Sequence, residues 1–150
     1  MILVDTNLLI YATDKSNQRH DAVRAWLEQR LTGGGEVGFA WIALLGFIRI
    51  TTNFRVMRNC FSIAQAISHV SAWLANPGAR IIGPTAAHWQ QLQTMLRSAG
   101  TGGNLTTDAH LAALAAEHDC ELCAADGDFS RFAGLKWRNP LKAAHTKAES

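Results

Sequence analysis

Short apolar runs alternate with longer amphipathic stretches along most of the chain. The runs at residues 2–4, 36–40, 79–82 and 121–125 are typical of strands, the first of them a buried central strand, and residues 135–141 fit a final edge strand. Between the runs, apolar residues recur every three or four positions, which predicts helices. Strands and helices that alternate in this way predict an α/β fold with a mainly parallel central sheet and helices on both faces.

The helical spacing also predicts which side chains face the core. The expected helices are a short one after the first strand and longer ones at residues 21–31, 41–52, 62–76, 86–99 and from about 105 onward. On three of them the positions expected to face inward are Val23, Trp26, Leu27 and Leu31, then Trp41, Leu44, Leu45 and Ile48, then Trp89, Leu92 and Leu96.

The chain has 150 residues, of which 48% are hydrophobic and 17% charged, so it is long enough for one domain with its own core. We expect that domain at residues 1–141, followed by a polar and flexible C-terminal tail at 142–150. No apolar run approaches the roughly 20 residues of a membrane span, and no secretory signal opens the chain, so the expected location is cytoplasmic. The net charge of +2 permits a phosphate-rich partner without requiring one.

Three cysteines, an odd number, argue against a disulfide framework. Cys120 and Cys123 have C-x-x-C spacing, but residues three apart on one strand point to opposite faces. No second pair or nearby histidine completes a ligand set, so we expect neither a redox nor a zinc site.

Acidic residues follow two of the predicted strands. Asp5 comes directly after the first strand, and Asp126 and Asp128 follow the strand at residues 121–125. Asp108 lies in the first turn of a helix. In a parallel sheet these positions can share one edge, where α/β proteins bind their ligands. The alternative is that Asp5 and Asp108 only cap helices, because aspartate is favoured at a helix N-terminus.

Carboxylates gathered at one edge raise one another's pKa unless a cation neutralises them. Mg²⁺ suits such a set, because it takes oxygen ligands and is usually bound by one or two carboxylates together with substrate phosphates. Bound Mg²⁺ can activate water for attack on a phosphodiester. No G-x-S-x-G motif indicates a serine nucleophile, and the six histidines are expected to be surface or packing residues, although His110 lies close to Asp108 in the sequence.

Residues 51–58 mix polar, aromatic and basic side chains in a predicted loop. This mixture suits contact with the backbone and base faces of a nucleic acid, but a solvated connector is the more common explanation of such a loop. Arg49, just before the loop, is either an exposed arginine with a buried stem or a functional residue.

Three motifs in this order resemble those of PIN-domain ribonucleases: Asp5-Thr6-Asn7, residues 107–115, and Asp126-Gly127-Asp128-Phe129. More narrowly, residues 41–53 resemble the mycobacterial branch of the VapC toxins of type II toxin–antitoxin modules. The resemblance covers about residues 1–141. It implies a small α/β/α sandwich that dimerises, binds Mg²⁺ or Mn²⁺, and cuts tRNA, rRNA or mRNA to stop translation. It also implies a VapB-type antitoxin whose C-terminal segment fills the acidic site, with promoter DNA bound only through that antitoxin.

By motif position, the resemblance implies that Asp5, Asp108 and Asp126 are the metal-site acids and that Asp128 is an additional catalytic acid. Two further roles follow in the same way. Thr6 or Asn7 would position water or a ligand, and Arg49 would contact a phosphate or an antitoxin carboxylate.

One departure from the family pattern lies at Gly46, where many PIN ribonucleases carry a glutamate. Glycine weakens a helix interior by about 1 kcal/mol relative to alanine, so we expect close packing at this position. Three outcomes stay open. Asp128 compensates for the missing acid, or metal binding is weaker, or the chain is a catalytically weak RNA- or antitoxin-binding module.

Overall fold

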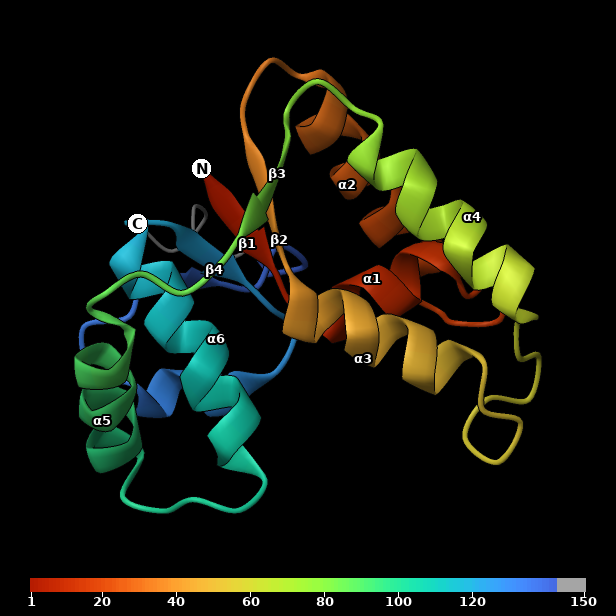
Figure 1. Cartoon of the computed structure of the whole chain (residues 1–150). Helices are drawn as coiled ribbons and strands as arrows, with labels where there is room; N and C mark the ends of the chain where they lie inside the picture. The colour runs from red at the N-terminus through yellow and green to blue at the C-terminus, as the bar shows by residue number, and fades with distance from the viewer. Residues whose placement is uncertain (143–150) are drawn as a thin grey trace.

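A five-stranded parallel sheet organises the molecule, which a computed structural model describes over residues 1–142. The strand order is β3-β2-β1-β4-β5, and every neighbouring pair is parallel (Figure 1). β1 is therefore the central strand and β5 an edge strand, as predicted. The strands are β1 (Ile2–Val4), β2 (Val37–Ala40), β3 (Ala79–Ile82), β4 (Glu121–Cys123) and β5 (Trp137–Arg138).

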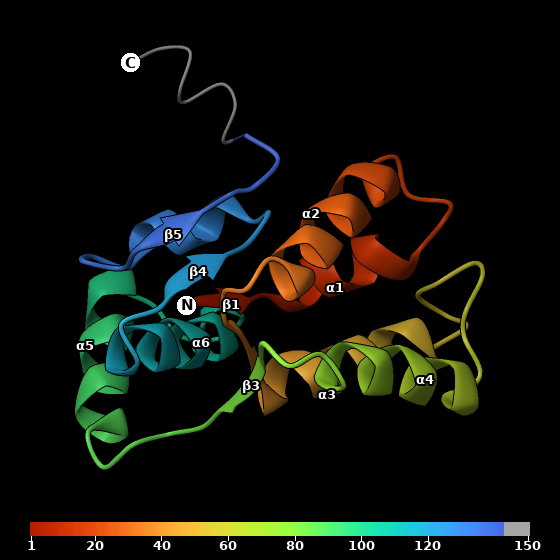
Figure 2. The ribbon, with the colours of Figure 1, turned by 90° about the horizontal axis from the view of Figure 1, so that it is seen from above.

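Six α-helices cover the two faces of this sheet. Helices α1–α4 pack on one face, and α5 and α6 pack on the other, each side with its own apolar core (Figure 2). The predicted α/β/α sandwich is therefore confirmed. The helices are α1 (Thr6–Thr13), α2 (His20–Thr32), α3 (Trp41–Thr51), α4 (Ile63–Leu74), α5 (His88–Ala99) and α6 (Leu105–Glu117), and a 3₁₀ turn, η1, spans Gly127–Arg131.

The alternation of side chains along the strands separates the two cores. In β1, Ile2 and Val4 pack toward α1–α4, whereas Leu3 packs toward α5 and α6. Cys120 and Cys123 are likewise buried on opposite faces, as the spacing predicted. Burial raises the pKa of the Cys123 thiol to about 12, so this side chain stays protonated and behaves as a core residue.

The predicted inward face of α3 is wrong in part. Leu44 is buried as expected, but Trp41 and Leu45 are 54% and 58% exposed. The buried positions beside Leu44 are Ala43 and Phe47. Because α3 is apolar almost all round, its periodicity does not distinguish the covered face from the uncovered one.

A second correction concerns α5. Trp89 is 65% exposed, and Met95 is the buried residue of this helix. Leu92 and Leu96 are partly buried, as predicted. Helix α5 packs mainly on α6, and this single contact covers only a narrow stripe of the helix.

The ends of the elements follow local sequence signals. The side chain of the predicted cap Ser62 accepts the N–H of Gln65 at 3.1 Å, and the Ser62 N–H donates to Oε1 of Gln65 at 2.9 Å, which starts α4. Over residues 1–142, no helix has both the length and the apolar character needed to cross a membrane. The predicted C-terminal tail lies, apart from Lys142, outside the described residues.

Candidate active site

A cleft of about 600 Å³ opens at the carboxyl edge of the sheet, between α3 and the start of α6. Six of the predicted site residues line it: Asp5, Thr6, Asn7, Arg49, Asp108 and Asp126. They come from segments more than 100 residues apart in the sequence, which the parallel strands bring to one edge. Asp128 is exposed and is not part of the lining.

The strand register fixes the floor of the cleft. Asp5 follows β1, and its N–H donates to the carbonyl of Cys123 at 3.0 Å, which continues the β1–β4 ladder by one residue. Asp126 leaves β4 three residues after Cys123. Its carboxylate accepts the N–H of Asp128 at 2.9 Å, and this bond starts η1 and turns Asp128 away from the cleft.

Asp108 lies in the first turn of α6, as the helix-terminus alternative predicted, but neither Asp5 nor Asp108 makes a side-chain cap hydrogen bond. Asp5 stands at the N-cap position of α1, but its carboxylate makes no cap hydrogen bond. The N-cap position of α6 is Asn104, so Asp108 does not hold it. The two carboxylates are therefore available to the cleft.

The acids of the cleft perturb one another. Burial raises the pKa of Asp5 to about 6, and the charges of Asp108 and Asp126 add to this effect, while the N–H groups of Thr6 and Asn7 offset part of it. Burial also raises the pKa of Asp108 to about 6, with further contributions from Asp126 and Asp128. Within residues 1–142, none of these acids forms an ion pair with a basic side chain.

These residues fit a hard divalent cation. Over the described part of the chain, no three acidic, histidine or cysteine side chains converge tightly enough to enclose a metal ion by themselves. Mg²⁺ does not need such a cage, because it is usually held by one or two carboxylates, several waters and a substrate phosphate. Unpaired carboxylates with raised pKa values are the groups that such an ion stabilises.

Gly46 lies against Thr6, and this contact explains the glycine. A Cβ at position 46 would lie 3.0 Å from Thr6 Oγ1 and 3.2 Å from Thr6 Cγ2. The Thr6 hydroxyl donates to the carbonyl of Ala43 at 3.2 Å, so its side chain is held in this position. The predicted close packing is confirmed. Thr6 occupies the space that a larger side chain at position 46 would need.

Gly46→Ala is expected to destabilise the protein by about 1 kcal/mol, because crowding against Thr6 exceeds the gain in helix propensity. In a Thr6→Ala background the nearest Thr6 atom that remains is Cβ, 3.7 Å away, so the same substitution should stabilise by up to about 1 kcal/mol. Urea unfolding of the four proteins measures the coupling. Stabilisation by Gly46→Ala in both backgrounds would contradict the packing argument.

The sequence did not indicate the apolar wall of the cleft. Ile42, Leu45 and Arg49 lie three and four positions apart along α3 and face the cleft together. Ile50 and Leu111 extend the wall, and Thr107 adds a hydroxyl beside Asp108. The available signal was the helical spacing of Leu45 from Arg49, a predicted site residue, but Leu45 was expected to face the core.

His110 does not face the acids. Its Nδ1 lies 2.9 Å from Nε2 of His88, and Nδ1 of His88 contacts the carboxylate of Glu117 at 2.5 Å. Glu117 also accepts the hydroxyl and N–H of Thr85. This network joins α5 to α6, so the predicted packing role of His110 is confirmed.

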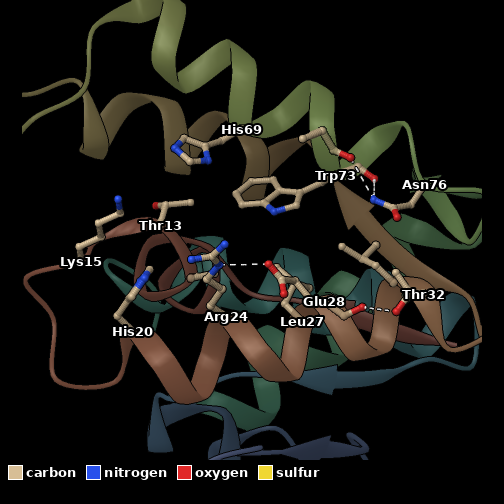
Figure 3. Close-up of a pocket in the computed structure, with 13 residues that line it drawn as sticks. Thr13, Lys15, His20, Arg24, Leu27, Glu28, Thr32, His69, Trp73 and Asn76 are labelled. Atoms are coloured by element: carbon tan, nitrogen blue, oxygen red, sulfur yellow. Dashed lines mark hydrogen bonds and ion pairs between the residues drawn. The ribbon is translucent and has the colours of Figure 1, made fainter.

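A second cavity of about 470 Å³ lies between α2 and α4. Figure 3 shows side chains from both helices pointing into it, among them His20, Arg24, His69 and Trp73. Its one acid, Glu28, is paired with Arg24 at 3.0 Å. This cavity therefore has no group of unpaired carboxylates, in contrast to the cleft at the sheet edge.

The comparison with protein families agrees with this arrangement. The model of the PIN domain matches residues 2–135. The chain belongs to the PIN domain family. Ribonuclease VapC37 of Mycobacterium tuberculosis is 42% identical over 140 residues, which cover 93% of this chain and 97% of that protein. Ribonuclease VapC33 of the same organism is 38% identical over 95% of this chain and 99% of its own length, so the chain falls within the VapC branch of the PIN domain family.

Solved structures of PIN proteins share the fold. VapBC2 from Rickettsia felis, bound to a DNA fragment from its promoter, superposes with a TM-score of 0.66 at 22% identity and covers 93% of this chain and 98% of its own. VapC20 of Mycobacterium tuberculosis, described as a Sarcin-Ricin loop cleaving toxin, has a TM-score of 0.65 at 20% identity and covers 90% and 96%. At this identity the likeness concerns the fold.

Proposed function

We propose that this PIN domain is a metal-dependent endoribonuclease that acts as the toxin of a type II toxin–antitoxin module. One observation carries the proposal. Asp5, Asp108 and Asp126 come from three separate segments and line one cleft, and within residues 1–142 none of them forms an ion pair. The ribonuclease names of its VapC relatives support the assignment of RNA as the substrate.

In this proposal Asp5, Asp108 and Asp126 hold Mg²⁺, for which Mn²⁺ can substitute. The bound ion supplies an activated water and neutralises charge on the phosphoryl oxygens. Asp128, outside the cleft, adds negative charge that acts on Asp108. This charge compensates in part for the acid that is missing at position 46.

Three further side chains position the substrate. Arg49 is exposed at the rim, where its guanidinium can hold a phosphate of the RNA or a carboxylate of the antitoxin. The Thr6 hydroxyl already donates to Ala43, so it offers the cleft only an acceptor. Asn7 makes no side-chain hydrogen bond within residues 1–142 and is therefore the better donor for orienting water or an RNA oxygen.

The proposed partners follow from the same family. The cognate partner is a VapB-type antitoxin whose C-terminal segment fills the acidic cleft, and promoter DNA is bound only through it. The substrate is a tRNA, rRNA or mRNA, and the toxin acts as a homodimer in the cytoplasm. The solved relatives that contain VapB with VapC support this partner.

Cleavage of total RNA by the purified protein, freed of antitoxin, tests the proposal. Discrete products are expected with Mg²⁺ or Mn²⁺ and none with chelator. A second function is favoured by the Thr6–Gly46 contact, because a side chain at position 46 on α3 would be crowded against Thr6 and the cleft lacks an acid there. In that case the protein binds RNA with a salt-dependent affinity but yields no products with either metal.

A further inference from the structure

The loop between α3 and α4 is held firmly at its base. The carbonyl of Asn53 accepts the N–H groups of Val56 and Met57 at 3.0 Å, and the N–H of Phe61 donates to Thr51 at 2.7 Å. The side chains of Met57 and Phe61 pack against the core of α1–α4. The backbone of the loop is therefore anchored to the fold at both of its ends.

Phe54 is the most exposed large hydrophobic side chain in the described structure, at 76%. The guanidinium of Arg55 lies 5.8 Å from the centre of its ring. Phe61 in the same loop is half-buried, so the loop covers one aromatic ring and presents the other. An exposed ring beside an arginine suits stacking with a nucleic-acid base, because both groups interact with π-faces.

The charge around Phe54 is one-sided. Residues 37–107 contain no aspartate or glutamate. Arg49, Arg55 and Arg58 are all exposed, and within the described residues none of them forms an ion pair. Arginines that are exposed and not engaged in an ion pair within the described residues match a phosphate backbone.

The loop directly follows α3, the helix that forms one wall of the acidic cleft. Ile42, Leu45 and Arg49 face the cleft from α3, and the loop begins directly after this helix ends at Thr51. Figure 1 shows the loop at the end of α3 that lies farther from the sheet. A strand of RNA that leaves the cleft along α3 therefore reaches Arg49 first and Phe54 next.

We propose that this loop binds the single-stranded RNA next to the scissile phosphate, with one base stacked on Phe54 and phosphates held by Arg55 and Arg58. The inference rests on the proposed ribonuclease function. Phe54, Arg55 and Arg58 would then hold the part of the substrate that lies outside the cleft.

Binding of a fluorescein-labelled 12-nucleotide oligouridylate to the Asp5→Asn protein, followed by anisotropy, tests the stacking. Phe54→Ala should weaken binding by about fivefold or more, the loss of one stacked base. Phe54→Leu should behave like Phe54→Ala, whereas Phe54→Trp should retain the affinity because it keeps an aromatic face. Trp89→Ala, which removes another exposed aromatic ring, is the matched control and should bind like the parent.

The dependence of the RNA affinity on salt concentration distinguishes the contribution of Arg55 and Arg58 from that of the Phe54 ring. Each phosphate contact contributes about 0.7 to the slope of log affinity against log salt concentration for a single strand. The Arg55→Ala/Arg58→Ala double variant should therefore flatten the slope by about 1.4, whereas Phe54→Ala should leave it unchanged.

Unchanged affinity in Phe54→Ala, or absence of oligouridylate binding in the parent, would overturn the inference. It would also be overturned if Phe54→Ala weakened only antitoxin binding, which would make the loop a protein contact. A wild-type protein that binds RNA through Phe54 but cuts none would contradict the ribonuclease function alone. If wild type and Phe54→Ala bind and cut RNA equally well, only the role of the loop would be contradicted.

Discussion

Asp5→Asn is expected to reduce RNA cleavage by about a hundredfold or more, which is the loss typical of removing one group that stabilises transition-state charge. Asp5 is 8% exposed at the floor of the cleft, and its carboxylate forms no cap and no ion pair in the described structure. Asparagine keeps the shape of the side chain and removes its charge. The cleavage rate of a labelled RNA with saturating Mg²⁺ is the measurement.

The same substitution should stabilise the metal-free protein at pH 7. The folded pKa of Asp5 is about 6, above the value of 3.8 expected for an unfolded chain, so ionisation opposes folding at neutral pH. Removing the charge should raise the free energy of unfolding by up to about 3 kcal/mol, the equivalent of roughly two pKa units. At pH 4 the folded carboxyl is already protonated, so most of the gain should vanish.

Asp21→Asn is the matched control, because Asp21 is an exposed aspartate in the first turn of α2, outside the cleft. The Asp21→Asn protein should retain full cleavage, and its free energy of unfolding should fall by a few tenths of a kcal/mol at most. Two results would exclude the proposed role of Asp5. One is full cleavage by Asp5→Asn, and the other is a destabilisation by Asp5→Asn that is as large at pH 7 as at pH 4.

The sequence predicted the sheet well because its strands are short, apolar and separated by strong helix and turn signals. β1 and β3 have the predicted bounds, and the capping pair Ser62 and Gln65 marks the start of α4. The sequence also predicted that Asp5 and Asp126 lie together, because the carboxyl ends of parallel strands share one edge of the sheet. That prediction requires only the residue at which each strand ends.

Other features depend on contacts between segments that are distant in the sequence. The hydrophobic periodicity of the sequence does not predict such contacts. The fit of Gly46 against Thr6 joins positions 40 residues apart, and only the packing of α1 on α3 creates it. Asp126 and Asp128 look equivalent in the sequence, yet the hydrogen bond that begins η1 leaves one in the cleft and the other outside. Leu45 was assigned to the core because its apolar character is the same whether it faces a core or a cleft.

Mg²⁺ is expected to stabilise the protein far more at pH 7 than at pH 4. In chelator, the raised pKa values of Asp5 and Asp108, about 6 each, mean that the folded state binds protons more tightly than the unfolded state between about pH 4 and pH 6. The contribution of these two groups to stability is therefore full at pH 4 and is lost as the pH rises through 6. Asp108 is about half buried, so solvent screening reduces its share.

A bound cation should offset much of this loss, because it stabilises the ionised carboxylates that burial disfavours. At a Mg²⁺ concentration of about 100 times the dissociation constant, binding adds roughly 2.7 kcal/mol to the free energy of unfolding. That gain should be present above pH 6 and nearly absent at pH 4, where protons occupy Asp5 and Asp108. Urea unfolding at pH 4, 5, 6 and 7, with Mg²⁺ and with chelator, provides the measurement.

The difference between wild type and Asp5→Asn isolates the cleft from other titrating groups. Burial lowers the pKa values of His69 and His110, so their contribution to stability rises with pH and opposes that of the acids. Both histidines remain in the variant and cancel in the difference. In chelator, the variant should lose the part of the pH dependence of stability that Asp5 contributes. It should also lose most of the stabilisation by Mg²⁺. A Mg²⁺ effect that survives Asp5→Asn, or that is equal at pH 4 and pH 7, would place the ion elsewhere on the protein.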